Sequence, residues 1–505
     1  MTFRALALGL LLSSSTSFAF AQKSMPLLNS PKATQQFYAA SKSQQIWSDD
    51  TNYTALLNAL ETLSAHGLNP ADYHIDALKG MSTPSADRDQ LATDAWFSAA
   101  AHMLYGKLNP TSVEPDWTAA RREANLPEIL QNALSEKTIA TSFEALAPTQ
   151  PSYRALKSEL AALRAEAAKP QTLISAGEVL KPNMTSSRVI ELKRRLIELE
   201  YLAVSDLTNV MDSDTVDAVK AFQNAVDLDA DGAVGPATLS ALNRGLDVKL
   251  NQVLVNMERW RWLPNDLGKR HLRANIAGFD VTAWNDGVKE RTHLTIVGKT
   301  FRKTPVFSDR VQYLVFNPWW ETPNSLATRD KLPTFRKDPS AVERLGFQIL
   351  DRQGGVVQST SIDWNAVSPS NFPYRIRQRP GDLNALGQVK IMFPNKHNVY
   401  LHDTPTKGLF AQRQRAFSSG CLRTENPLDL SAWLLSDTAD WTRSRIDNVV
   451  ATGKETRATL KQSIPVHILY FTIENEGDYG VRYLDDIYDR DAKVLAGLKA
   501  KPRSN

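Results

Sequence analysis

The spacing of apolar residues changes along the chain and divides it into regions that must fold differently. From Pro31 to Ala168, Ala, Leu, Glu, Gln and Lys recur with helical spacing, as in TALLNALETLSAHGL. From Leu272 onwards, β-branched and aromatic residues dominate, as in HLRANIAGFDVTAW. A chain of 505 residues is also long for one domain. We therefore expect several compact units, helical at first and mainly β later.

The first helical region carries no catalytic constellation. The segments GLNP at 67–70 and GKLNP at 106–110 end two predicted helices with glycine followed by proline. We predict a helical scaffold domain over residues 31–170. A polar, proline-containing stretch then separates it from the next unit.

The N-terminus has the composition of a secretory signal. Arg4 precedes an apolar run from Ala5 to Leu12, and Ala19-Phe20-Ala21 is a small-x-small cleavage site. We expect residues 1–21 to be removed, with an uncleaved anchor as the alternative. No later stretch approaches about 18 uninterrupted apolar residues, so we expect no integral membrane span in the mature chain.

The net charge and the single cysteine limit the functions that we expect of this chain. The chain has 59 basic and 55 acidic side chains, a formal net charge of +4, which gives no electrostatic reason to expect nucleic acid as a partner. Cys421 is the only cysteine, so an internal disulfide is impossible. In an exported protein such a thiol is either inertly buried or kept for its chemistry.

Residues 186–243 form a compact segment with two amphipathic helical stretches, SSRVIELKRRLIEL and DSDTVDAVKAFQNAV. The aspartates of the following DLDADGAVGPATLSAL are spaced as in a calcium loop, but Thr238 stands where that loop needs a bidentate Glu. Asp231-Gly232, Gly235-Pro236 and Thr238 instead match a D-G-x-x-G-P-x-T turn. The segment resembles the peptidoglycan-binding repeat, which implies a three-helix module and a glycan ligand.

The later region predicts a mainly β domain with some helices, which we place at residues 250–495. Asn285-Asp286-Gly287 between two strand-like runs is a strong hairpin signal. Residues 323–380 read as an insertion that contains FQILDRQGGVVQ, a plausible hairpin, and much polar loop. Insertions of this kind beside an active site often serve as lids.

The segment YLHDTPTKGLFAQRQRAFSSGCLR, from Tyr400 to Arg423, carries the chemistry. His402 ends a predicted strand and Cys421 sits on a glycine-containing turn. A thiol of pKa about 8.5 is barely ionised at neutrality, so an adjacent imidazole that takes its proton makes it far more reactive. His397 falls in a turn and reads as a surface residue.

This segment resembles the active-site signature of the YkuD-type L,D-transpeptidases, in which a His precedes a Ser/Thr-x-Gly-Cys turn. The order of units resembles the large periplasmic subgroup of that family. The resemblance implies a multidomain fold: an α-helical scaffold, a three-helix peptidoglycan-binding module, and a mainly β (α+β) catalytic domain with a lid-like insertion. It also implies a periplasmic location.

The resemblance implies Cys421 as nucleophile and His402 as general base and acid. Other residues of the segment are candidates for oxyanion or substrate binding. The N–H groups near Gly420 and Cys421 can point at a developing oxyanion, and Arg423 can bind a stem-peptide carboxylate or hold the turn. Ser418, Ser419 and Tyr400 either contact the site or are structural. Many smaller family members have a second His where this chain has Ser419, so the role of base falls on His402 alone.

The reaction that the family implies is a 3→3 cross-link between peptidoglycan stem peptides. Cys421 attacks the third residue of a tetrapeptide stem, releases D-Ala, and passes the acyl group to the amine of a second stem. An L,D-carboxypeptidase, a D-amino-acid exchange enzyme or a protein-anchoring enzyme would use the same thioester. A third possibility is a peptidoglycan-binding scaffold with a vestigial catalytic domain. No metal or organic cofactor is expected.

Overall fold

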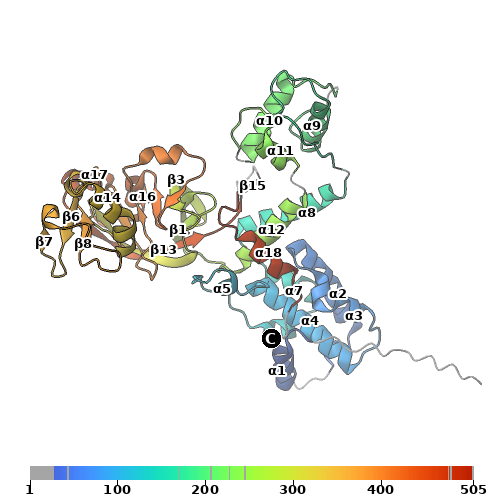
Figure 1. Cartoon of the computed structure of the whole chain (residues 1–505). Coiled ribbons are helices and arrows are strands. Elements are labelled where there is room, and N and C mark those ends of the chain that lie inside the picture. Colours follow the sequence, from blue (N-terminus) through green and yellow to red (C-terminus); the bar gives the residue numbers. More distant parts are fainter. Residues whose placement is uncertain are drawn as a thin grey trace, which may run out of the picture.

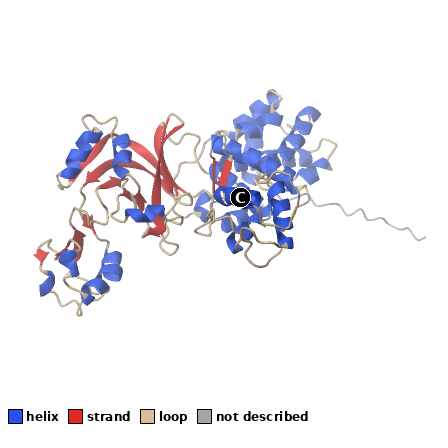
Figure 2. Ribbon diagram, turned by 90° about the horizontal axis from the view of Figure 1, so that it is seen from above, coloured by secondary structure: helices blue, strands red, loops and turns tan. Residues whose placement is uncertain are grey.

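The computed structural model describes residues 28–502 apart from 42–44, 170, 205–206, 227, 244–245, 476 and 478–479. The predicted signal peptide, residues 1–21, lies outside the described residues. Figure 1 shows a helical part, a small helical module and a part rich in strands. Figure 2 shows the strands gathered on one side of the molecule and most helices on the other. The predicted multidomain architecture is confirmed.

The N-terminal part is helical, as the apolar spacing predicts. Asp49 and Ser85 cap two of its helices by accepting hydrogen bonds from the N–H groups of Thr51 and Arg88. Gly67 ends a helical segment with a φ of 72°, in the left-handed region that glycine adopts without strain. The helices are α1 (Pro31–Ser41), α2 (Asp50–Thr62), α3 (Ile75–Lys79), α4 (Ala86–Tyr105), α5 (Pro110–Val113), α6 (Leu126–Ser135), α7 (Ile139–Ala145) and α8 (Pro151–Ala167).

Helix α12 (Leu246–Arg261) packs with the scaffold, although we assigned residues 250–495 to the catalytic domain. Its Met257 and Trp260 are buried in the same core as the scaffold helices. The C-terminal helix α18 (Asp491–Lys499) lies against α12. An amphipathic sequence predicts that one face is buried but not against which partner, so this boundary was not visible in the sequence.

The middle module has a core of its own, built by α9 (Ser187–Glu198), α10 (Ser213–Ala225) and α11 (Pro236–Leu242). The Gln223 side chain ties the D-G-x-x-G-P-x-T turn together: it accepts from the Gly232 N–H at 2.9 Å and donates to Asp231 at 2.8 Å and to Thr238 at 3.1 Å. The turn residues therefore organise the backbone before α11.

The strand-rich part is a barrel. In the described chain its strands form one nine-stranded sheet of order β11-β3-β12-β10-β9-β4-β13-β1-β2, and an additional β2–β3 pairing closes it. Asp286 and Gly287 form the β2–β3 hairpin turn with φ values of 48° and 77°, as their sequence predicts. The strands are β1 (Arg270–Asn275), β2 (Asp280–Asn285), β3 (Val288–Gly298), β4 (Phe307–Phe316), β9 (Val389–Met392), β10 (Leu401–His402), β11 (Ala416–Ser418), β12 (Leu422–Thr424) and β13 (Thr456–Leu469). Helices α16 (Pro427–Leu434) and α17 (Arg443–Ala451) accompany the barrel.

The insertion between β4 and β9 is a small subdomain with its own apolar core. The predicted FQILDRQGGVVQ hairpin is present, because β6 pairs antiparallel with β7. The elements are β5 (Trp320–Glu321), α13 (Asn324–Leu326), η3 (Ala327–Lys331), α14 (Leu332–Lys337), α15 (Ala341–Arg344), β6 (Phe347–Leu350), β7 (Val356–Val357) and β8 (Arg375–Gln378).

A second hairpin connects the barrel to the scaffold. Strands β14 (Ile473–Asn475) and β15 (Val481–Tyr483) pair antiparallel, and both contact α8. The Tyr483 hydroxyl donates a 2.5 Å hydrogen bond to Glu159 of α8. None of the described helices is both long enough and apolar enough to cross a membrane.

Candidate active site

Strand β10 positions His402 between two cationic residues. In the ladder, His402 pairs with Lys390 of β9 on one side and with Arg423 of β12 on the other. Leu401, the preceding residue, is fully buried among its own cross-strand partners in the barrel core. Because side chains alternate along a strand, His402, Lys390 and Arg423 share the opposite face of the sheet.

The same register brings the nucleophile candidate to this face. Cys421 directly precedes β12, where Leu422 pairs with Leu401, and the Leu422 N–H donates to the carbonyl oxygen of Tyr400 at 3.1 Å. Cys421 therefore lies beside Tyr400, two residues before the His402–Arg423 pair on the two strands. The four predicted site residues Tyr400, His402, Cys421 and Arg423 meet on one face.

The turn before Cys421 is held by side-chain hydrogen bonds. Gly420 has a φ of 123°, a conformation that favours glycine. Its N–H donates to the Ser418 hydroxyl at 3.0 Å, and that hydroxyl donates to the Cys421 carbonyl at 2.6 Å. Thr304 donates to the Gly420 carbonyl at 2.9 Å. In this geometry the Gly420 N–H is already used, which leaves the Cys421 N–H as the candidate oxyanion donor.

The Cys421 thiol is half-buried, with its Sγ 3.6 Å from the carbonyl oxygen of Asn398. Burial raises the pKa of the thiol above its usual value, while hydrogen bonds from Tyr400 and the charges of Lys390 and Arg423 act in the lowering direction. The thiol is therefore protonated at neutral pH and needs a base.

His402 is 6% exposed, and its Nδ1 hydrogen-bonds the backbone carbonyl of Asp403. A carbonyl only accepts, so Nδ1 carries the proton and Nε2 is left as the basic atom. Burial, followed by the charges of Arg423 and Lys390, lowers the pKa of His402 to about 3. The imidazole is therefore neutral over the physiological range of pH.

Tyr400 faces the site as well as the core. Its ring lies edge-on to His402 at a centroid distance of 5.6 Å, and the Lys390 Nζ lies 4.0 Å from the ring centroid. Burial and the neighbouring Cys421 raise the pKa of Tyr400, so its hydroxyl stays protonated. Tyr400 also packs against the cores of both the barrel and the insertion.

The insertion is linked to the turn before Cys421 through Arg302. Arg302 donates to the exposed Ser419 hydroxyl at 2.9 Å and forms a 3.1 Å ion pair with Asp330 of η3. Arg423 donates to Thr406 at 3.2 Å. Ser418 and Ser419 thus hold the turn or tie it to the insertion.

Lys390, Asn398, Arg302 and Asp330 were missed by the sequence reasoning. The position of Lys390 could have been predicted, because side chains alternate along the strand QVKIMF and Lys390 falls on the face opposite the apolar residues. His397, which we predicted at the surface, is half-buried and lies 3.6 Å from Asp116.

Comparisons with known proteins agree with the resemblance. Residues 269–466 match the model of the YkuD family, described as an L,D-transpeptidase catalytic domain. Residues 185–242 match a model described as "Putative peptidoglycan binding domain", and residues 32–160 match one described as a scaffold domain.

A protein of Haemophilus influenzae named "Putative L,D-transpeptidase" is 37% identical over 245 residues, 48% of this chain and 48% of that protein. The chain thus spans about half the length of this curated relative. Two solved structures cover 60% of this chain: an L,D-transpeptidase fragment of Xylanimonas cellulosilytica (16% identity, TM-score 0.17, all of that chain covered) and an L,D-transpeptidase of Stackebrandtia nassauensis (11% identity, TM-score 0.20, 97% of that chain covered).

At such TM-scores the assignment rests on the sequence matches. The barrel region, residues 269–466, is similar to the YkuD family of L,D-transpeptidase catalytic domains, and the regions before it are similar to a scaffold domain and to a putative peptidoglycan-binding domain.

Proposed function

We propose that this protein is a periplasmic peptidoglycan L,D-transpeptidase that forms 3→3 cross-links through a thioester on Cys421. The observation that carries the proposal is the meeting of Cys421, His402, Tyr400 and Arg423 on one face of the barrel, within a domain similar to that family. The module that resembles a peptidoglycan-binding domain would hold the chain on its substrate.

The first half-reaction makes the acyl-enzyme. The Cys421 sulfur attacks the carbonyl carbon of the third stem residue, a C–S bond forms, and the C–N bond to the terminal D-Ala breaks. The thiol proton passes through His402 Nε2 to the amine of the leaving D-Ala. The Cys421 N–H is the donor that we assign to the tetrahedral oxyanion.

The low pKa of His402 suggests how the base is switched on. With a pKa of about 3 the imidazole is a poor acceptor for a thiol proton, because Arg423 and Lys390 oppose a third positive charge. A stem-peptide carboxylate bound at Arg423 would neutralise that charge and raise the basicity of His402. We therefore assign Arg423 a double role, in binding the donor and in making base catalysis depend on it.

The second half-reaction depends on the acceptor. The side-chain amine of a second stem attacks the thioester carbonyl, the C–S bond breaks, and the proton of the amine returns to the sulfur through His402. Water would give an L,D-carboxypeptidase, a D-amino acid an exchange enzyme, and a protein amine an anchoring enzyme. The location of Lys390 and Arg423 beside the thioester disfavours a protonated amine, so the acceptor must arrive neutral.

Product analysis with competing acceptors tests this proposal. Purified protein is incubated with a disaccharide-tetrapeptide alone and with excess D-methionine, beside Cys421→Ala, and the soluble products are separated by mass spectrometry. We expect a cross-linked dimer with loss of one D-Ala in the first sample. Tripeptide alone would assign a hydrolase, and exchange without dimer would assign an exchange enzyme.

A further inference from the structure

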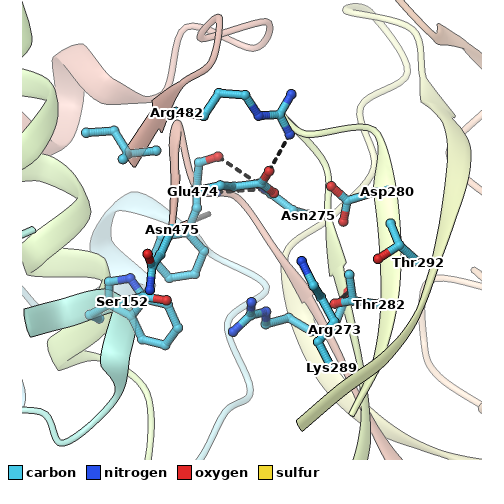
Figure 3. Close-up of a pocket in the computed structure, with 13 residues that line it drawn as sticks. Ser152, Arg273, Asn275, Asp280, Thr282, Lys289, Thr292, Glu474, Asn475 and Arg482 are labelled. Atoms are coloured by element: carbon cyan, nitrogen blue, oxygen red, sulfur yellow. Dashed lines mark hydrogen bonds and ion pairs between the residues drawn. The ribbon is translucent and has the colours of Figure 1, made fainter. Parts of the chain in front are cut away.

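A polar cavity lies where the barrel meets the scaffold. It has a volume of about 250 Å³ and is bounded by α8, α12, the first three strands of the barrel and the β14–β15 hairpin. Figure 3 shows polar and charged side chains converging on it from these elements. Its lining belongs neither to the turn of Cys421 nor to β10 and β12, so the catalytic site does not account for it. Its charged residues are Arg273, Asp280, Lys289, Glu474 and Arg482.

Arg273 reaches this cavity from β1 with its guanidinium held by aromatic rings. The guanidinium carbon lies 4.5 Å from the ring centroid of Trp284 and 5.7 Å from that of Trp260. Rings hold a guanidinium by its face and leave its N–H donors unused. Among the contacts of the described residues, the Arg273 guanidinium makes these two aromatic ones and no hydrogen bond, and the residue is only partly exposed.

The two carboxyl groups of the cavity, Glu474 and Asp280, already have hydrogen-bond partners. Glu474 accepts from Asn275 at 2.6 Å and from Arg482 at 2.7 Å, as Figure 3 shows. Asp280 is hydrogen-bonded to Glu474, and burial together with the Glu474 charge raises its pKa well above the usual range. Asp280 and Glu474 thus share a hydrogen bond, and Glu474 is also paired with Arg482.

The charge that remains in the cavity is positive. Three cations, Arg273, Lys289 and Arg482, line it together with only two carboxyl groups, Asp280 and Glu474, whose charges attract Arg273. This excess of positive charge favours an anion that enters the cavity. A planar carboxylate matches the fork of an arginine.

We propose that this cavity binds a small carboxylate-bearing ligand of the amino-acid or peptide kind, with its carboxylate on Arg273. The volume lies just below the range of roughly 300–1,000 Å³ that is typical of ligand sites, which suits one or two residues of a peptide. The hydroxyl and amide groups of Ser152, Thr282 and Asn475 in the lining suit the polar atoms of such a ligand. The same carboxylate chemistry belongs to a free amino acid and to the end of a stem peptide, and separate probes distinguish these sources.

The test measures binding to the full mature chain carrying Cys421→Ala, so that no thioester forms. D-alanine and a disaccharide-tripeptide are titrated separately by ligand-observed NMR, with D-alaninamide as a probe of the same size that lacks the carboxylate. We expect at least one carboxylate probe to bind and D-alaninamide to bind at least about tenfold more weakly, the effect of one charge-assisted contact. Binding of D-alanine assigns a free amino acid as the source, and binding of the tripeptide alone assigns a stem end.

Two variants locate the site. Arg273→Gln should weaken binding at least about tenfold, whereas Arg457→Gln, an exposed arginine of β13 outside the cavity, should leave it unchanged. Lys289 is exposed, so Lys289→Gln should not disturb folding. It should weaken binding about twofold to fivefold, because one charge at the rim is lost. Circular dichroism and Tm check that each variant is folded.

Three results overturn the proposal: neither carboxylate probe binds, D-alaninamide binds equally well, or binding survives in both Arg273→Gln and Lys289→Gln. A fourth result would also overturn it: binding kept in Arg273→Gln but lost in Arg423→Gln, which would place the ligand on the face of Cys421. Because no turnover is measured, these results are independent of whether Cys421 forms an acyl-enzyme.

Discussion

His402 and Arg423 are directly paired across the parallel β10–β12 ladder, which places a guanidinium beside the proposed base. The consequence is electrostatic. A cation at this position disfavours the imidazolium, and it holds the pKa of His402 down in the absence of an anionic substrate.

Replacing Arg423 should therefore raise the pKa of His402. Removal of a neighbouring positive charge favours the protonated ring, so Arg423→Gln should move the pKa upward from about 3. Histidine-selective NMR titration measures it. Arg457→Gln, an exposed arginine on β13, is the matched control and should leave the pKa where it was. An unchanged pKa in Arg423→Gln would remove the proposed coupling between donor binding and base.

Tyr400→Phe should make the thiol less acidic. The Tyr400 hydroxyl is one of the groups that lower the pKa of Cys421 against the effect of burial. A higher pKa leaves less thiolate at a given pH, so alkylation by iodoacetamide should be slower at pH 8 and its rate profile should shift to higher pH. Tyr313→Phe, on β4, serves as control. Identical profiles for Tyr400→Phe and the parent would show that the hydroxyl does not stabilise the thiolate.

Gly420→Ala should damage the catalytic turn while leaving the fold intact. The φ of 123° is strained for alanine, at a cost of about 1–3 kcal/mol, although the added carbon would meet only the Lys303 carbonyl oxygen, at 3.9 Å. We expect the backbone to shift and acylation to fall by more than about tenfold, which is a barrier of about 1.4 kcal/mol. At Gly408 an added carbon would meet nothing within 4 Å and φ is outside the left-handed region, so Gly408→Ala should acylate normally. Equal acylation rates in the two variants would argue against a required geometry at Gly420.

The Arg302–Asp330 pair should matter more for acylation than for stability. Both side chains are partly exposed, so Asp330→Asn should change the free energy of unfolding by less than about 1 kcal/mol. It should nevertheless slow acylation, because Arg302 ties the insertion to Ser419. Glu321→Gln breaks a comparable exposed pair with Arg375 in the same insertion and should have no effect on the rate. If both variants acylate at the parent rate, the contact does not position the insertion for catalysis.

Local features of this fold were predictable from the sequence because they depend on neighbouring residues. Asp286-Gly287 forms its turn through two positive φ values, and strand alternation alone places Tyr400 and His402 on one face. The order of units followed from composition and motifs.

Features that depend on distant partners were not predictable. Lys390 is a neighbour of His402 only because β9 pairs with β10 in the closed barrel, and α12 joins the scaffold through packing that its own sequence does not specify. The Ser418 hydroxyl that occupies the Gly420 N–H likewise emerges only from the folded turn.

The central claim is that Cys421 carries the acyl group, and intact mass tests it most directly. Folded protein is mixed with a disaccharide-tetrapeptide, quenched at short times and weighed by mass spectrometry beside Cys421→Ala. The predicted result is an adduct equal to the donor minus its D-Ala on the parent protein and none on the variant. An adduct on Cys421→Ala, or neither adduct nor product from the folded parent across several stem peptides, would contradict the account.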